Sequence, residues 1–508
     1  MTRAGKKLSE VVAGLEILES QGDLETLVSG VQHDSRRIES GDVFVAIAGM
    51  VADGHRFVGD AASRGAAAAV VSRPMDPGVL RAIVRVAQTR LALAHLAANL
   101  FEHPSLAFSL IGITGTNGKT TLTYLLESVV QAAGGVPGVV STVSIRHPGY
   151  EEDNLYTTPE ASDLQAMLHR MRQAGATHVA MEVTSHGLDL QRVRGCHFKV
   201  AVFTNLSRDH LDYHQDIGSY AAAKALLFSR ELPESRAADK VAVANRDDPR
   251  WEDILRGWKG DLITFGHSEA ADVHPLGPVD YSLEGFAARV ASPLGEIDLR
   301  CHLTGRHNLE NAMAAVAVAS ALKIPAEAVV RGVAACSRVP GRLERVDSGR
   351  GPAVFVDYAH TDQALGNVLG ALRELAPGRL LVVFGCGGDR DRGKRPLMGK
   401  AVAAGADLAV VTSDNPRSED PQAIIAQILP GLEGWSEVEA SRLGDSRKKS
   451  YVQLADRREA IRLAVAAARD GDVILIAGKG HETYQIVGTT RHDFDDREVA
   501  RAALKERE

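Results

Sequence analysis

A buried strand, a glycine turn and a helix form the clearest hydrophobic pattern in this chain. The apolar run from Leu106 to Ile113 predicts the strand, and Gly115 and Gly118 interrupt it. Lys119 and Thr120 open the helix that follows. Its apolar residues recur three and four positions apart, at Leu122, Leu125, Leu126, Val129 and Val130.

Similar patterns divide the chain into three expected domains, 1–103, 104–336 and 337–508. A length of 508 residues is also typical of about three domains. Glu102 to Ser105 is the expected linker between the first two, because Pro104 discourages helix continuation.

The order of the expected elements indicates the fold class. The first domain has a strand at 43–48, a helix near 57–64 and a strand at 67–71. Strands of the second domain end at Val183, Phe203 and Val243, and the third has apolar runs at 354–356, 380–384, 408–411 and 473–476. Because helical stretches separate these runs, we expect an α/β protein with parallel sheets in both later domains.

Polar clusters follow several of these strands immediately. They are Glu182, Asp357, Gly385 to Asp391, Asp414 to Arg417 and Gly478 to Glu482. In open parallel sheets, ligands bind outside the carboxyl ends of the strands. We therefore expect an active site that uses more than one domain.

The glycine turn has the chemistry of a nucleotide-binding loop. Its residues are Thr114, Gly115, Thr116, Asn117, Gly118, Lys119 and Thr120. Backbone N–H groups and the helix N-terminus suit phosphates, the lysine reaches the outer phosphates, and the last hydroxyl suits Mg²⁺. Ile113 stands where the general Walker pattern has glycine. A glycine turn without a ligand is the alternative.

Glu182, His210 and Lys224 are further candidates. Glu182 and His210 each follow a predicted strand, and a carboxylate and an imidazole can ligate Mg²⁺. Polar surface residues are the alternative. Lys224 lies in an apolar helix at 220–228, where a lysine that snorkels to solvent is the usual interpretation.

Two clusters in the third domain suit a zwitterionic amino acid. Arg390 is a candidate fork for a carboxylate, and the run Asp414, Asn415, Pro416 and Arg417 adds an arginine and two groups that can hold an ammonium. A solvated charged loop is the alternative. Arg342 lies at the domain junction, where it could clamp a phosphate when domains close. Asn308 precedes an alanine-rich helix at 312–322, so helix capping also explains it.

Composition narrows the classes of partner. Hydrophobic residues make up 45% and charged residues 24%, and the net charge is −7, so no global basic field favours nucleic acid or anionic membranes. The polar N-terminus lacks a signal-peptide core, and no apolar run is long enough to span a membrane. Four widely spaced cysteines suit reduced thiols. We expect a cytoplasmic monomer that acts on small molecules.

At the candidate site residues named above, the chain resembles the Mur ligases, the ATP-dependent amino-acid ligases of peptidoglycan synthesis. The resemblance covers nearly the whole chain, and the family's phosphate loop corresponds to residues 115–120, which explains Ile113. Motifs similar to those of members that add the third peptide residue are 34–36, 42–46, 157–159, 205–214, 357–361, 388–391 and 478–482. The run 414–417 resembles the version that selects meso-diaminopimelate over L-lysine.

The resemblance implies a role for each candidate. The UDP end of one substrate would contact Ser35, Phe44, Val45 and Ala46, and its muramoyl-dipeptide end Thr157, Thr158, Ser185 and Arg192. ATP would contact 114–120, Asn308, Arg342 and Asp357, and Mg²⁺ would contact Thr120, Glu182, His210 and a carbamylated Lys224. Diaminopimelate would contact Arg390, 414–417, Gly478 and Glu482.

It also implies a three-domain fold and a reaction. The domains would be a small α/β UDP-binding domain, a central parallel-sheet domain that binds ATP, and a C-terminal Rossmann-like domain. ATP would activate the D-glutamyl γ-carboxylate of UDP-N-acetylmuramoyl-L-alanyl-D-glutamate as an acyl phosphate, and an amine of meso-diaminopimelate would displace the phosphate. An L-lysine-adding member, a ligase similar to folylpolyglutamate synthetase and a phosphate-loop regulator are the alternatives. Thr184 and Asp362 stand where the family commonly has serine and proline.

Overall fold

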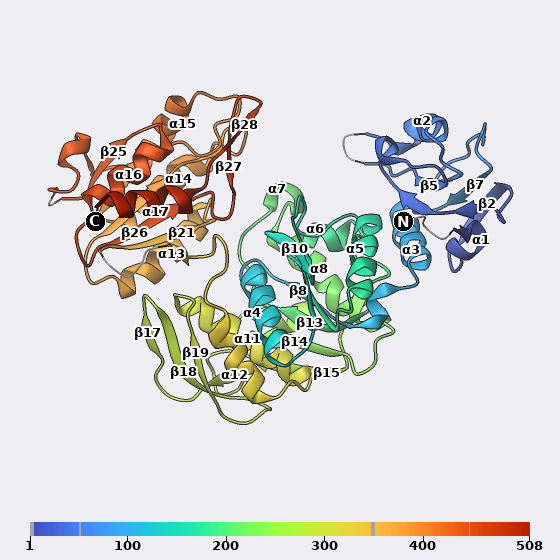
Figure 1. The fold of residues 1–508 in the computed structure, drawn as a ribbon, viewed down its shortest axis with the longest axis horizontal. Coiled ribbons are helices and arrows are strands. Elements are labelled where there is room, and N and C mark those ends of the chain that lie inside the picture. The colour runs from blue at the N-terminus through green and yellow to red at the C-terminus, as the bar shows by residue number, and fades with distance from the viewer. Residues whose placement is uncertain (1–4, 50–51, 347–350, 447, 508) are drawn as a thin grey trace. The chain divides into compact units, whose positions relative to one another are not determined.

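The computed structural model describes residues 5–49, 52–346, 351–446 and 448–507, which form two compact units (Figure 1). The first unit comprises Met1–Pro275, Val290–Ile297 and Glu310–Gly332. The second comprises Leu276–Arg289, Asp298–Leu309 and Val333–Glu508. The boundary expected at residue 103 lies inside the first unit, so the three domain boundaries stay predictions.

The N-terminal part is built on a sheet with the strand order β2-β7-β6-β5-β4. The strands are β2 (Ile17–Gly22), β7 (Ala82–Val86), β6 (Ala68–Val71), β5 (Asp42–Val45) and β4 (Gly30–Gln32), and only the β2–β7 pair is antiparallel. A second pair is β1 (Lys6–Lys7) with β3 (Leu27–Val28). The helices are α1 (Leu8–Val11), η1 (Ser35–Arg37), η2 (Gly54–Phe57), α2 (Val58–Ser63) and α3 (Thr89–Leu100). The strand expected at 43–48 therefore ends at Val45, and the helix expected at 57–64 is shorter.

The central sheet has the strand order β11-β10-β9-β12-β8-β13-β14-β15. Its strands are β8 (Ser109–Thr114), β9 (Pro137–Val140), β10 (Ser144–His147), β11 (Tyr150–Asp153), β12 (His178–Glu182), β13 (Phe198–Phe203), β14 (Val241–Asn245) and β15 (Asp261–Phe265). All neighbours are parallel except β10 with β9 and β11. The strand expected from Leu106 begins only at Ser109, because Pro104 starts the short helix η3 (Pro104–Ala107) instead.

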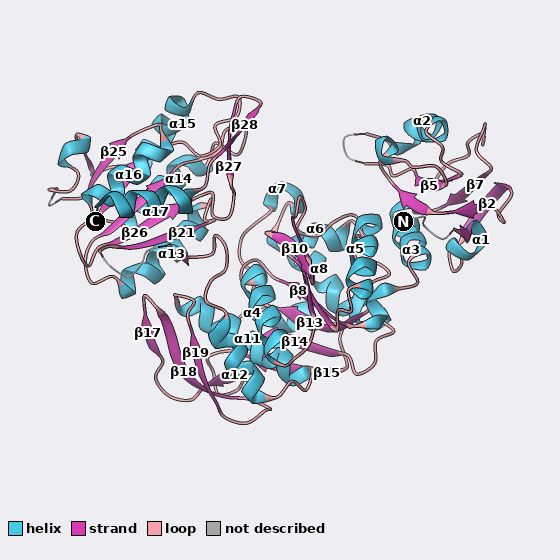
Figure 2. Ribbon diagram, viewed as in Figure 1, coloured by secondary structure: helices cyan, strands magenta, loops and turns pink. Residues whose placement is uncertain are grey.

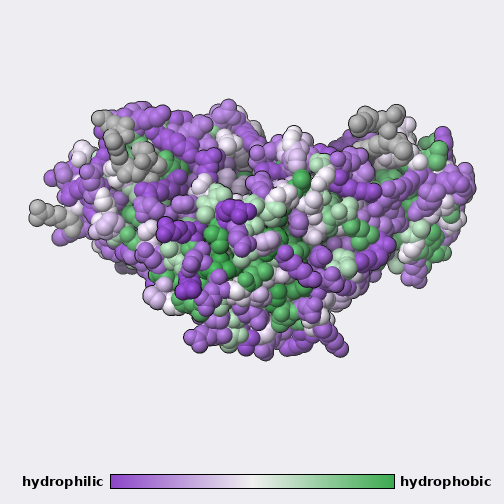
Figure 3. Space-filling model, turned by 60° about the horizontal axis from the view of Figure 1, so that its bottom comes forward, coloured by the Kyte–Doolittle hydropathy of each residue, from purple (hydrophilic) through white to green (hydrophobic). Residues whose placement is uncertain are grey.

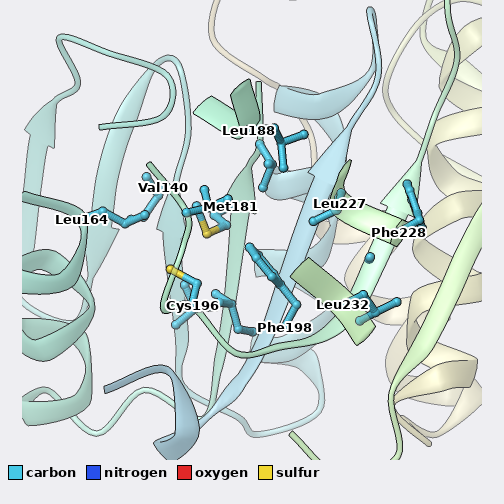
Figure 4. Packing of buried hydrophobic residues seen from close by; sticks show 14 of the residues in the cluster. Val140, Leu164, Met181, Leu188, Cys196, Phe198, Leu227, Phe228 and Leu232 are labelled. Atoms are coloured by element: carbon cyan, nitrogen blue, oxygen red, sulfur yellow. The ribbon is translucent and has the colours of Figure 1, made fainter. Parts of the chain in front are cut away.

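Helices flank this sheet, as Figure 2 shows in cyan. They are α4 (Lys119–Ala132), α5 (Ala161–Gln173), α6 (Ser185–Asp189), α7 (Leu211–His214), α8 (Ile217–Leu226), η4 (Leu227–Glu231), α9 (Leu232–Glu234), α10 (Trp251–Leu255), α11 (Arg306–Ala321) and α12 (Ala326–Ala335). Helix α11 begins at Arg306, so Asn308 lies inside the helix and the capping interpretation is wrong. Figure 4 shows one core of this unit, where Met181 and Phe198 of the sheet meet Leu227 and Phe228 of η4.

Residues 274–301 form a small sheet that the sequence analysis did not predict. Its strands are β16 (His274–Pro275), β17 (Asp280–Ser282), β18 (Gly285–Ala291) and β19 (Ile297–Cys301). Strand β18 pairs antiparallel with β16 and β17. Within β18, apolar residues alternate with polar ones over only a few positions, and so short an alternation is a weak signal of a strand in a single sequence.

The C-terminal sheet has the strand order β20-β21-β26-β22-β23-β25-β24. The strands are β20 (Glu344–Arg345), β21 (Ala353–Asp357), β22 (Leu380–Phe384), β23 (Leu408–Val411), β24 (Ser436–Glu437), β25 (Ser450–Gln453) and β26 (Val473–Ala477). All are parallel to their neighbours except β20, and a separate antiparallel hairpin joins β27 (Tyr484–Val487) to β28 (Thr490–Asp493). The four apolar runs predicted in this domain are confirmed as strands.

Both faces of this sheet are covered, which explains the uninterrupted apolar runs. Phe355 and Leu475 pack with α13 (Asp362–Leu375), α14 (Lys394–Gly405) and α15 (Pro421–Ile428). Val354 and Ile474, one residue earlier, face the opposite side and pack with α16 (Arg457–Ala467) and α17 (Asp496–Arg507). The remaining short helices are η5 (Leu429–Leu432) and η6 (Ala440–Arg442).

Hydrophilic residues predominate on the face drawn in Figure 3. None of the helices in the described ranges is long and apolar enough to cross a membrane. All four cysteines are free, as their spacing predicted, and all four are buried.

Candidate functional site

The glycine turn lies between β8 and α4, at the carboxyl edge of the central sheet. Gly115 has φ +147° and Gly118 has φ +87°, conformations that strongly favour glycine. A Cβ atom on Gly115 would lie 1.9 Å from Oγ1 of Thr204, and one on Gly118 would lie 2.4 Å from Oδ1 of Asn311. The two glycines are therefore required by backbone conformation and by close neighbours.

The segment after β13 braces this loop. The N–H of Thr116 donates to the carbonyl of Asn205 at 2.8 Å, and the N–H of Asn117 donates to Oδ1 of Asn205 at 2.9 Å. The hydroxyl of Thr204 donates to the carbonyl of Asn117 at 2.6 Å. The ammonium of Lys119 donates to the carbonyls of Gly115 and Thr116 at 2.9 and 2.8 Å, so it lies against the loop that it was predicted to serve.

Glu182 and Thr120 meet at the start of α4. The hydroxyl of Thr120 donates to Oε1 of Glu182 at 2.8 Å, and the carboxylate is only 1% exposed. Thr142 donates its N–H to Oε1 at 2.8 Å and its hydroxyl to Oε2 at 3.1 Å. Thr142 was not predicted, because nothing in a single sequence distinguishes this threonine from the others.

This pair has the oxygen donors that Mg²⁺ prefers. Within the described residues, no group of three or more His, Cys, Asp or Glu side chains could hold a metal ion. Mg²⁺ commonly binds through one or two carboxylates together with phosphate and water oxygens. Glu182 and Thr120 beside a phosphate-type loop fit that mode of binding.

Lys224 of α8 is 1% exposed, so the snorkelling interpretation is wrong. Its Nζ lies 2.8 Å from the carbonyl of Gly115 and 4.3 Å from the ring centroid of Tyr220. Burial, and then the charge of Lys119, hold the pKa of Lys224 well below its usual value. The shift makes the neutral amine, the nucleophilic form, more accessible to Lys224 than to a lysine in solvent.

His210 lies next to α8. Its ring packs against those of His186 and Tyr220, with centroids 5.0 and 6.1 Å apart. The hydroxyl of Tyr220 lies 3.3 Å from Oγ1 of Thr116. These contacts connect His210 to the phosphate loop through one tyrosine.

The residues expected to hold the dipeptide form a network at the end of β12. Arg192 donates to the carbonyl of Thr158 at 3.0 Å and pairs with Glu160 at 2.9 Å. Thr158 donates its hydroxyl to the carbonyl of Glu182 at 3.0 Å. Thr157 joins the same network, since its hydroxyl lies 3.0 Å from that of Thr142.

Ser185 begins α6 beside this network. Its hydroxyl lies 2.9 Å from Nε2 of the buried His214. In the N-terminal sheet, Phe44, Val45 and Ala46 are at most 1% exposed. Ser35, in η1, is 7% exposed.

Asn308, Arg342 and Asp357 belong to the second unit. Asp357, at the end of β21, accepts hydrogen bonds from the N–H groups of Leu343 and Ala359 at 2.6 and 2.8 Å. Burial raises the pKa of this carboxyl group, although Arg342 opposes the shift. The guanidinium of Arg342 lies 5.2 Å from the ring centroid of Tyr358. Asn308 donates to the carbonyl of Thr304 at 2.8 Å.

Three polar clusters of the C-terminal sheet, 385–391, 414–417 and 478–482, meet at its carboxyl edge. Asn415 donates to Oε2 of Glu482 at 2.9 Å, and the guanidinium of Arg417 donates to the carbonyl of Gly388 at 2.8 Å. Hairpin β27–β28 contacts this edge, since the N–H of Arg417 donates to the carbonyl of Ile486 at 3.1 Å. Arg390 is exposed in the preceding loop.

Asp414 and Gly478 are also adjacent. A Cβ atom on Gly478, which has φ +118°, would lie 3.4 Å from Oδ2 of Asp414. Oδ1 of Asp414 is buried and accepts no hydrogen bond from the described residues. The ammonium of Lys479 lies 3.6 Å from this oxygen, beyond hydrogen-bond distance, so Oδ1 can still accept a hydrogen bond from a ligand ammonium.

Two buried cations at this edge were not predicted. Lys479 lies inside the run 478–482, but its charge gave no reason to expect complete burial. Arg457, the first residue of α16, donates to the carbonyls of Ser413 and Ala477 at 3.3 and 3.0 Å. Only the fold brings this arginine to the strand ends.

Comparisons with known proteins match this architecture. Residues 27–100 match the family model "Mur ligase family, catalytic domain", residues 113–319 match "Mur ligase middle domain", and residues 341–480 match "Mur ligase, glutamate ligase domain". The UDP-N-acetylmuramoyl-L-alanyl-D-glutamate–2,6-diaminopimelate ligase of Geobacter metallireducens is 44% identical over 504 residues, which cover 98% of each chain.

Solved structures of ligases also match this chain. A UDP-N-acetylmuramoyl-L-alanyl-D-glutamate–2,6-diaminopimelate ligase structure matches with a TM-score of 0.70 and 32% identity, over 99% of each chain. Folylpolyglutamate synthase of Mycobacterium tuberculosis, complexed with ADP and AMPPCP, is 23% identical and matches 77% of this chain and 92% of its own with a TM-score of 0.60. The similarity to folylpolyglutamate synthase is therefore a similarity of fold.

Proposed function

This chain belongs to the Mur ligase family, and we propose that it joins meso-diaminopimelate to UDP-N-acetylmuramoyl-L-alanyl-D-glutamate at the expense of ATP. The observation that carries the proposal is the amino-acid site of the C-terminal sheet, where Asp414, Asn415 and Glu482 lie together beside Arg417. The carboxylates suit an ammonium and the guanidinium suits a carboxylate. Relatives that are named as this ligase match nearly the full chain, which supports the choice of substrates.

The first step transfers the γ-phosphate of ATP to the D-glutamyl γ-carboxylate, which gives an acyl phosphate and ADP. Both reactants are anionic, so the positive charge of Lys119 and the N–H groups at the start of α4 offset their repulsion. Mg²⁺, held by Thr120 and Glu182 with help from His210, would add charge neutralisation at the phosphates. Thr142 fixes the orientation of the Glu182 carboxylate through two hydrogen bonds.

In the second step, the amine of diaminopimelate attacks the acyl carbon and phosphate leaves. Asp414 and Glu482 hold an ammonium of the ligand, and Arg417 and Arg390 hold carboxylates. Alignment of the amine with the acyl carbon can supply several kcal/mol, up to about 7–11 kcal/mol. These four residues therefore accelerate the step by positioning the amine.

Lys224 is proposed to act as a carbamate. Its neutral amine attacks CO₂, a nitrogen–carbon bond forms, and one proton is released. The product is a lysine carbamate, which places an anionic oxygen ligand where an unmodified lysine has only its amine. Its burial and its lowered pKa support this role.

The remaining roles rest on position and on the family. We propose that Ser35 and residues 44–46 contact the UDP end, that Thr157, Thr158, Ser185 and Arg192 contact the dipeptide, and that 114–120, Asn308, Arg342 and Asp357 contact ATP. Four free cysteines support a reducing compartment, which we propose is the cytoplasm. The monomeric state stays a prediction.

A coupled assay of ADP release tests the function. The expected result is ADP release that requires both UDP-N-acetylmuramoyl-L-alanyl-D-glutamate and meso-diaminopimelate, and that Lys119→Ala abolishes. ATP turnover without either substrate would support a phosphate-loop regulator instead. Preference for L-lysine would refute the role given to Arg417.

A further inference from the structure

Lys479 is a fully buried cation among the proposed ligand groups of the amino-acid site. Its side chain is 0% exposed, and its Nζ donates to Oδ1 of Asn415 at 3.1 Å and to Oε2 of Glu482 at 3.3 Å. Oδ1 of Asp414 lies 3.6 Å away from the same nitrogen. One ammonium therefore contacts all three acidic or amide side chains of the site.

The partners of Lys479 are themselves held in place. Asn415 donates to Oε2 of Glu482 at 2.9 Å, and its Oδ1 also accepts from the N–H of Ile486 at 2.9 Å. Glu482 and Asp414 are partly accessible, with side chains 18% and 10% exposed. The carboxylates can thus reach a ligand, whereas the buried ammonium cannot.

Burying an ammonium is costly unless its interactions compensate for lost solvation. With two carboxylates and one ammonium, this cluster carries a net charge of about −1 when all three groups are ionised. Without the ammonium the two carboxylates would repel each other.

We propose, on the basis of the proposed ligase function, that Lys479 is a positioning residue that orients Asp414, Asn415 and Glu482 and matches the site to one ammonium group of the incoming amino acid. It does not touch the ligand. It fixes the two carboxylates in the arrangement that a single ligand ammonium completes.

Steady-state kinetics of Lys479→Met in the full-length enzyme tests this role. Lys449→Met is the matched control, because it removes an exposed lysine of the same unit whose Nζ donates to the carbonyl of Ala403. We expect KM for meso-diaminopimelate to rise about tenfold or more in Lys479→Met, which corresponds to about 1.4 kcal/mol. KM for ATP and for the UDP-linked substrate should stay within about twofold of the wild type.

A purely structural role gives a different result. Loss of folded enzyme lowers the apparent kcat and leaves every KM unchanged, and that outcome would overturn the proposal. Lys479→Gln, which keeps a donor, should give a smaller rise in KM, and it replaces Lys479→Met if that variant does not fold. Failure of both variants to fold would also overturn the proposal, since it would assign Lys479 to stability.

The test separates this inference from the proposed function. Absence of diaminopimelate-dependent turnover in the wild type would refute the function itself. Wild-type turnover with an unchanged KM in Lys479→Met would refute only the role of Lys479.

Discussion

Replacement of Asp496 by leucine should destabilise the second unit strongly. Asp496 begins α17 and pairs with Arg457 of α16, with Nε–Oδ1 and Nη2–Oδ2 distances of 2.8 and 2.7 Å. Both side chains are 0% exposed. Asp496→Leu leaves a buried guanidinium without its counter-charge, which costs about 3–5 kcal/mol. This is a large part of the roughly 5–15 kcal/mol that stabilises a typical domain.

The double variant provides the decisive comparison. Arg457→Met with Asp496→Leu removes both charges, and leaves the carbonyls of Ser413 and Ala477 without the hydrogen bonds from Arg457. Each lost hydrogen bond that leaves a buried carbonyl unsatisfied costs about 1–3 kcal/mol, or about 2–6 kcal/mol for the two. Removal of both charges offsets this cost, because replacing a buried ion pair by apolar side chains is often neutral or stabilising, by about 1–4 kcal/mol. We therefore expect the double variant to be more stable than Asp496→Leu alone.

Urea unfolding can follow the second unit separately. The chain has three tryptophans, and Trp435 is the one in that unit, so a Trp251→Phe, Trp258→Phe background makes fluorescence report on it. A loss below about 1 kcal/mol for Asp496→Leu, or a double variant less stable than this single one, would refute the argument from buried charge.

Three other results are expected. Gly118→Ala should weaken ADP binding by more than tenfold in calorimetry, because its Cβ would lie 2.4 Å from Oδ1 of Asn311. The control variant Gly134→Ala, at φ +78° with no atom within 4 Å of the added Cβ, should bind ADP normally. Equal ADP affinities of the two variants would contradict this prediction. Lys224→Ala should lose ligase activity and regain part of it with short carboxylic acids such as acetate, and no recovery at any acid concentration would argue against the carbamate. The hydrogen bond from Arg395 lowers the pKa of Glu419 to about 2, so the stability that Glu419 contributes should be present above its ordinary pKa of 4.5 and lost as pH falls towards 2. The midpoint of urea unfolding should therefore depend less on pH in Glu419→Gln, and an unchanged dependence would contradict the ion pair.

Most of the site chemistry that could be predicted from the sequence was predicted from short motifs. Residues 114–120 require a strand, two permissive glycines and a helix start, and the local sequence encodes all three. The strands of the C-terminal sheet were equally clear, because burial on both faces gives uninterrupted apolar runs. The sheet at 274–301 was missed because short strands leave little periodic signal.

Lys224 shows where local sequence reasoning fails. One lysine in an apolar helix normally reaches solvent, yet here its Nζ lies in the interior against the carbonyl of Gly115. The two residues are far apart in sequence, so only chain topology brings them together.

The sequence by itself determined the family, the α/β class and the residue types that suit phosphate and amino-acid ligands. These follow from local periodicity and from motifs within a few residues of each other. Only the tertiary structure decided which polar groups meet, as Thr142 does with Glu182 and Lys479 with Asn415. The burial that lowers the pKa of Lys224 is likewise a property of the folded chain, because neighbours from distant segments exclude water from its amine.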